Sequence, residues 1–144
     1  MSNILGRTET LAKMHRGFYP RNVAVIGAAR HNQHRWIKSH LPFHRNHGKV
    51  FHVNIDEAEW PGAEELGVQN FHSILDIQDP IDYVTISVPR KIVPRLIEDC
   101  IKKEVAIVQV YTAGFEESGE EEGISLDHQI SEMARKSGLL IMGP

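Results

Sequence analysis

A chain of 144 residues with a formal net charge of −3 has the size of one globular domain and lacks the broad basic field of nonspecific nucleic-acid binders. Its 41% hydrophobic and 24% charged residues exclude the composition of a disordered protein. Its single cysteine, Cys100, excludes an intrachain disulfide and is expected in the core, and the absence of a long apolar run predicts a soluble, cytoplasmic protein with no membrane partner.

The first elements follow a polar lead, residues 1–17, in which a short helix is expected at 8–15. Four consecutive apolar residues at 23–26 predict a strand buried on both faces. A helix is expected at 36–43, weakened near its end by Pro42, and a second strand at 49–53. An acidic loop then leads to a third strand at 68–71 and a helical turn at 73–77.

The second half continues the alternation. We expect strands at 83–88, 105–111 and 139–142, and helices at 92–103 and 125–137, the last one capped by Gly138. Strands alternating with helices imply βαβ crossovers. The predicted fold is therefore α/β, a three-layer Rossmann-like, doubly wound and mostly parallel sheet in one domain over residues 18–144.

The ends of the strands are the expected ligand-binding edge of such a sheet. The first strand ends at Gly27-Ala28-Ala29-Arg30, where small side chains would let backbone amides approach a phosphate. The dinucleotide fingerprint needs further glycines and an acid after the second strand, whereas Asn54 stands there. This disfavours a nicotinamide or flavin cofactor, and simple strand-to-helix packing at the turn stays open.

Several motifs, taken together, resemble the CoA-binding domain shared by ADP-forming acyl-CoA synthetases and the alpha subunit of succinyl-CoA ligase. The matching stretches are VAVIGAAR at 23–30, FHVN at 51–54, SILDI at 73–77, DY at 82–83, ISVP at 86–89, YTAGFEE at 111–117 and GP at 143–144. They occur in the order and spacing that this family shows.

The resemblance implies a site for CoA or acyl-CoA along the predicted edge. It implies that the CoA diphosphate lies near Gly27, Ala28, Ala29 and Arg30, that the nucleotide lies near Asn54, and that the pantetheine arm passes Val88, Pro89, Thr112, Ala113 and Gly114. It implies no catalytic residue in this domain, because the family's phosphohistidine lies in a later one. The partners implied are further synthetase domains or a second subunit; a homo-oligomer stays open.

Two departures from the family's pattern lie beside this edge. The family's Pro-Gly-Lys-x-Gly segment is replaced by residues 31–36, so we expect Arg30, His31, His34 and Arg35 to supply cationic contacts in its place. Ile55 stands where many members have proline, which predicts a reshaped loop on the adenine side.

The remaining conspicuous residues have plainer interpretations. Six histidines between positions 31 and 52 suggest a metal site, but no acidic or cysteine ligand lies among them, which favours surface and phosphate-facing roles. The glutamates at 116–122 are expected in a solvated loop and helix start. Trp36 is expected in the core, and Trp60 is either packed or stacked on adenine.

Two other functions stay open. One is an NAD-binding oxidoreductase domain. The other is a stand-alone, CoA-responsive regulatory module.

Overall fold

The computed structural model describes residues 2–143, with side chains described from residue 6 onward; Pro144, of the Gly-Pro motif, lies outside this range. The longer helices are α1 (Ser2–Phe18), α2 (Arg35–Asn46), α3 (Trp60–Glu65), α4 (Val93–Lys102) and α5 (Glu121–Ser137). The strands are β1 (Asn22–Ile26), β2 (Lys49–Val53), β3 (Gln69–Phe71), β4 (Tyr83–Ile86), β5 (Ile107–Val110) and β6 (Leu140–Met142). Short 3₁₀ turns at η1 (Arg30–Asn32), η2 (Glu57–Glu59), η3 (Ile74–Asp76), η4 (Arg90–Ile92) and η5 (Glu116–Ser118) connect them.

The six strands form one sheet in the order β3-β2-β1-β4-β5-β6, and every adjacent pair is parallel. Chain connections move outward from β1 in one direction and from β4 in the other. The strand order therefore reverses between β1 and β4, which confirms the predicted doubly wound Rossmann-like fold.

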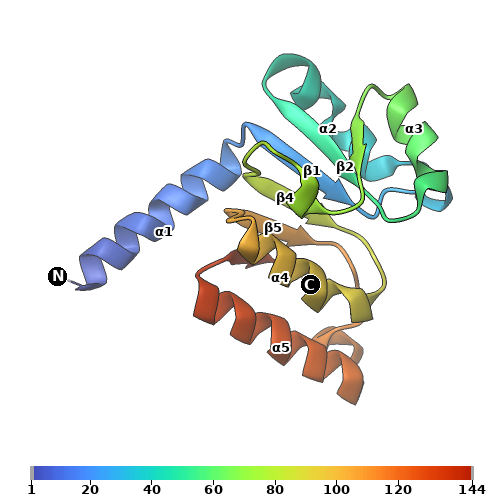
Figure 1. Ribbon diagram of the computed structural model, residues 1–144. Helices are drawn as coiled ribbons and strands as arrows, with labels where there is room; N and C mark the ends of the chain where they lie inside the picture. The colour runs from blue at the N-terminus through green and yellow to red at the C-terminus, as the bar shows by residue number, and fades with distance from the viewer. Residues whose placement is uncertain (1, 144) are drawn as a thin grey trace.

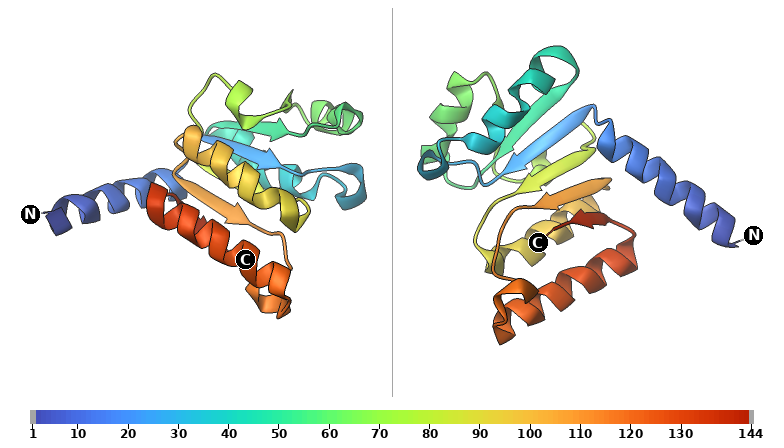
Figure 2. Two further views of the ribbon diagram at one scale, coloured as in Figure 1. Left: turned by 60° about the horizontal axis from the view of Figure 1, so that its bottom comes forward. Right: turned by 180° about the vertical axis from the view of Figure 1, so that it is seen from behind.

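Apolar residues on both sides of each central strand explain why helices cover both faces (Figures 1 and 2). On one face, Val23 and Val25 of β1 pack with Ile37 of α2 and Ala63 of α3. On the other face lies a larger cluster from β1, β2, β4 and β5, packed with η3, α4 and α5. Cys100 of α4 belongs to that cluster and is completely buried, which confirms its predicted core position.

Helix α1 is longer than the predicted segment, and it extends away from the sheet (Figures 1 and 2). Its final turn is held by Arg16, whose Nε donates to Asp82 Oδ1 at 2.6 Å and whose Nη2 donates to the Ile81 carbonyl at 2.8 Å. The other carboxylate oxygen of Asp82 accepts from the amides of Arg21 and Asn22. One buried carboxylate thus anchors both α1 and the start of β1.

Other boundaries also differ from the predictions. Helix α5 begins four residues earlier than expected, and the acidic residues Glu121 and Glu122 form its first turn, where the helix dipole favours them. Helix α3 replaces part of the expected loop, since Pro61 fits the first turn of a helix. Gly138 ends α5 in the left-handed conformation as predicted, with φ 77°. Among residues 2–143, no helix combines the length and apolar character that crossing a bilayer requires.

Candidate functional site

The turn after β1 lies at the point where the strand order reverses. Gly27 has φ +98°, and a Cβ built on it would lie 2.0 Å from the Ser87 carbonyl oxygen at the end of β4. Only glycine fits this close approach of two backbones. Ala28, the next residue, is completely buried. The small residues noted in the sequence therefore let the ends of β1 and β4 come together.

The carbonyl oxygen of Ala28 forms a hydrogen bond with a buried histidine. His52 of β2 is fully buried; its Nε2 lies 3.0 Å from the Ala28 oxygen, and its Nδ1 lies 2.6 Å from Asn70 Oδ1. Asn54 Nδ2 donates to the same Ala28 oxygen at 3.2 Å. With Ala28 O facing these groups, the backbone of the turn is tied to β2 and, through Asn70, to β3.

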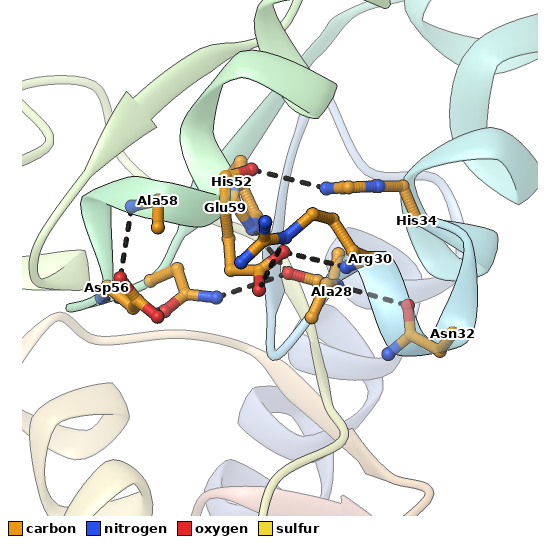
Figure 3. Close-up of polar contacts among 10 residues, drawn as sticks. Ala28, Arg30, Asn32, His34, His52, Asp56, Ala58 and Glu59 are labelled. Atoms are coloured by element: carbon orange, nitrogen blue, oxygen red, sulfur yellow. Dashed lines mark hydrogen bonds and ion pairs between the residues drawn. The ribbon is translucent and has the colours of Figure 1, made fainter.

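The next two amides of the turn are already bonded to side chains (Figure 3). The Ala29 amide donates to Asn32 Oδ1 at 3.0 Å, and the Arg30 amide donates to Glu59 Oε2 at 2.7 Å. Arg30 Nε also donates to Glu59 Oε1, at 3.2 Å. The hydrogen bond from the Arg30 amide, with the guanidinium beside it, lowers the pKa of the Glu59 carboxyl below its ordinary value, so Glu59 is ionised at neutral pH.

Beside this turn, a pocket of about 260 Å³ opens between the ends of β1, β2 and β4. Its walls are largely apolar, and Ile55 and Ile92, two of its lining residues, are 82% and 45% exposed. The lining residues are Ile26, Gly27, Ala29, His31, Val53, Asn54, Ile55, His72, Ser87, Val88, Pro89, Ile92 and Leu96. The position and character of the pocket suit an apolar or partly polar ligand segment beyond the strand ends.

The loops after β4 and β5 are joined by Arg90. Its Nη1 donates to the Gly114 carbonyl at 2.8 Å, and its Nη2 forms ion pairs with Glu120 and Glu122 at 2.6 and 2.8 Å. Hydrogen bonds to these glutamates raise the pKa of the arginine above its ordinary value. The Glu117 carboxylate accepts from the Gly114 and Phe115 amides, and these bonds lower its pKa.

A second link joins the same strands closer to the sheet. Thr112 Oγ1 donates to the Val88 carbonyl at 2.7 Å and accepts from the Val88 amide at 3.1 Å. Through this link and Arg90, the ends of β4 and β5 form one connected edge.

The structure brings together some of the predicted site residues and separates others. Six line the pocket, namely Gly27, Ala29, His31, Asn54, Val88 and Pro89. Arg30 is bonded to Glu59 and does not line the pocket, and neither does the completely buried Ala28. Arg35 begins α2 with its guanidinium 6.0 Å from the Trp36 ring, and Thr112, Ala113 and Gly114 follow β5, one strand farther along the edge.

Sequence reasoning missed His72, Ser87, Leu96 and Glu59. Ser87 was inside a predicted strand end and could have been included as a lining residue. His72, Leu96 and Glu59 carried no local signal, because they come from the segment after β3, the body of α4 and η2. His72 is held at the pocket by Glu57, whose Oε1 lies 2.8 Å from its Nε2.

The histidines that suggested a metal site have separate contacts. His34 Nε2 lies 3.2 Å from the Glu59 carbonyl oxygen, and His44 Nδ1 accepts from the Val50 amide at 3.1 Å. Residues 2–143 contain no group of three His, Cys, Asp or Glu side chains arranged to hold a metal ion. Trp60 is half-buried; its Nε1 donates to the Asn54 carbonyl and its ring lies 4.7 Å from that of His72.

Trp36 is half-buried against one apolar cluster and stacks on Tyr111, with ring centroids 4.0 Å apart. Trp36 thus lies at the edge of the core and is partly exposed, whereas the sequence predicted a position in the core.

The chain matches the family model described as a CoA binding domain over residues 21–144. It is 39% identical over 132 residues to the ADP-forming acetate–CoA ligase I subunit alpha of Pyrococcus furiosus, which covers 88% of this chain and 28% of the relative. It is 36% identical over 130 residues to the ADP-forming acetate–CoA ligase II of Archaeoglobus fulgidus, covering 88% of this chain and 18% of the relative. The chain thus spans less than a third of the length of these relatives.

Solved structures agree with these matches. A crystal structure of a Pyrococcus horikoshii OT3 protein superimposes with a TM-score of 0.76 at 36% identity, over 91% of this chain and 29% of that one. The apo acetyl-coenzyme A synthetase 1 of Ca. Korarchaeum cryptofilum gives 0.76 at 29% identity, over 91% and 27%. Prephenate dehydrogenase from A. aeolicus, solved with NAD⁺, gives 0.60 at 19% identity over 79% and 38%, which shows a shared fold alone.

Proposed function

The chain belongs to the family of CoA-binding domains found in ADP-forming acyl-CoA synthetases, and from this premise we propose where and how it receives CoA. The site that we propose is the pocket between β1, β2 and β4, together with the turn after β1 and the loop after β5. The observation that carries this proposal is the pocket itself, which lies at the strand-order reversal beside the turn of Gly27.

The residues present fit the chemistry of CoA. The apolar walls around Val88 and Pro89 suit the pantetheine arm, which is extended and largely uncharged. The basic side chains at the turn, Arg30 and His31, suit the diphosphate. The pocket volume of about 260 Å³ is small for the whole ligand, so we infer that it holds one segment while the rest runs along the edge toward Gly114.

Beyond this domain, we propose that the full protein is an acid–thiol ligase. Acyl-CoA, ADP and phosphate would be converted into the free acid, ATP and CoA. Apart from binding, we assign no step to residues of this chain. Domains or a subunit outside this chain would supply that chemistry.

Calorimetric titration of the purified chain with CoA tests the proposed site, with NAD⁺ and ADP as controls at the same salt concentration. We expect saturable binding of CoA, tighter than that of either control. The test variant is Val88→Asp, which places a charge on the pocket wall. Its matched control is Gln69→Asp, which adds the same charge at an exposed position of β3 away from the pocket. Equal CoA affinity in wild type and a folded Val88→Asp would refute this placement.

An oxidoreductase function is the weaker alternative. The position after β2 that holds the ribose-binding acid in dinucleotide domains is Asn54, and its side chain is used internally, by the Ala28 carbonyl and the Asp56 amide. Tighter binding of NAD⁺ than of CoA in the same titration would reverse this ranking.

A further inference from the structure

Glu59 places a negative charge where a phosphate-binding turn would be expected to receive its ligand. The carboxylate comes from η2, on the segment between β2 and α3, and reaches the turn after β1 (Figure 3). It accepts from the Arg30 amide at 2.7 Å and from Arg30 Nε at 3.2 Å. The Glu59 side chain is only 13% exposed, whereas that of Arg30 is 70% exposed.

These two donors are of the kinds that bind phosphate in proteins. A backbone amide at a turn after a strand and a guanidinium beside it are complementary to phosphate oxygens and to carboxylate oxygens alike. Arg30 is also flanked by Ala29 and His31, both of which line the pocket. A phosphate that used both donors of Arg30 would have to take the place of the Glu59 carboxylate.

The backbone around Glu59 is held firmly enough to keep the carboxylate at this position. Asp56 caps the segment, with its Oδ1 accepting from the Ala58 amide at 3.0 Å, and its carbonyl accepts from the Glu59 amide at 3.0 Å. The Glu59 carbonyl lies 3.2 Å from Nε2 of the buried His34. The carboxylate is thus tethered close to the turn, at an effective concentration of about millimolar or more.

We propose that Glu59 is an internal anion that competes with the ligand's phosphates for the turn after β1, and that it selects for ligands carrying a diphosphate. The inference rests on the proposed CoA site. A tethered carboxylate with one negative charge is displaced poorly by an isolated phosphate at low concentration. A diphosphate brings more charge and further oxygens, and the rest of the ligand adds contacts in the pocket.

Removing the charge of Glu59 while keeping its shape tests this proposal. We expect Glu59→Gln to bind CoA and inorganic pyrophosphate about tenfold more tightly than wild type, because a charge-assisted hydrogen bond no longer has to be broken. The control is Glu65→Gln on the neighbouring helix α3, an exposed position where the same charge is lost. Its affinities for both probes should match those of wild type.

The two probes separate this inference from the proposed function. If CoA fails to bind but pyrophosphate binds Glu59→Gln more tightly than wild type, the competing role of Glu59 stands and the CoA site is wrong. If the CoA affinity of Glu59→Gln is equal to or lower than that of the wild type, the inference is overturned and the CoA site stands. If neither CoA nor pyrophosphate binds any of the three proteins, both the proposed CoA site and the competing role of Glu59 are overturned.

A second measurement needs no substitution. In nuclear magnetic resonance spectra of the wild type, saturating pyrophosphate should shift the Arg30 amide and the Glu59 carboxyl carbon resonances together. Pyrophosphate binding that leaves the Glu59 carboxyl resonance in place would contradict displacement.

Discussion

Replacing Gly27 by alanine should destabilise the protein through two separable effects. The first is conformational: at φ +98°, a residue with a Cβ costs about 1–2 kcal/mol more than glycine. The second is steric: the new Cβ would lie 2.0 Å from the Ser87 carbonyl oxygen and 2.9 Å from Val88 Cγ1. Because the first contact is with backbone, neither partner can yield without moving β1 from β4, which costs about 1–3 kcal/mol.

The expected total is a loss of about 2–5 kcal/mol in the free energy of unfolding. For a chain of 144 residues, about 1 kcal/mol corresponds to roughly 3 °C, so the melting temperature should fall by about 6–15 °C. Chemical denaturation and calorimetry measure these two quantities. The loss should be accompanied by weaker CoA binding, because the turn and the pocket wall at Val88 move together.

Gly67→Ala is the matched control for this prediction. Gly67 also has a positive φ, +77°, but a Cβ there meets nothing within 4 Å. That variant should therefore show the conformational cost alone, about 1–2 kcal/mol. Equal destabilisation by the two substitutions would refute the argument that the approach of β1 to β4 requires glycine.

Three further predictions follow from the anchors of the fold. Asp82→Asn should lower the free energy of unfolding by about 1–3 kcal/mol and make α1 sensitive to trypsin, because the carboxylate that binds three donors is gone. The control Asp79→Asn, which breaks an exposed ion pair, should change the free energy of unfolding by no more than about 0.5 kcal/mol and leave the trypsin sensitivity unchanged. His52→Leu should cost about 1–3 kcal/mol in urea unfolding, since the Ala28 carbonyl loses one of its two partners and the half-buried Asn70 side chain loses its contact with the imidazole. An effect no larger than that of the exposed His128→Leu would count against this role. Burial raises the pKa of the Cys100 thiol, so its contribution to the free energy of unfolding is complete below the ordinary thiol pKa and decreases as the pH rises above it. Ellman's reagent at pH 8 should leave the native thiol unlabelled and react with it after denaturation. Labelling of the native protein would contradict the burial of Cys100.

The sequence by itself determined the fold class, and it predicted a binding edge at the ends of the strands. Consecutive apolar residues at Val23–Ile26 predict a strand covered on both faces, and alternation with helices restricts the topology to parallel crossovers. The turn at Gly27 was also visible, because a glycine directly after a buried strand has a local backbone reason. Gly138 was identified as a helix end for the same kind of reason.

Only the tertiary structure decided which side chains meet at that edge. At that edge, Glu59 is 29 residues from Arg30 and His52 is 24 residues from Ala28. At the opposite end of the sheet, Arg16 is likewise 66 residues from its partner Asp82. Local propensity and periodicity carry information over one helix or strand, whereas these contacts depend on how the sheet and its loops pack. The last turn of α1 was missed for the same reason, because the contact that holds it comes from Asp82, the residue before β4. Glu59, on η2, became visible as a partner of the turn after β1 only when the two segments were brought together.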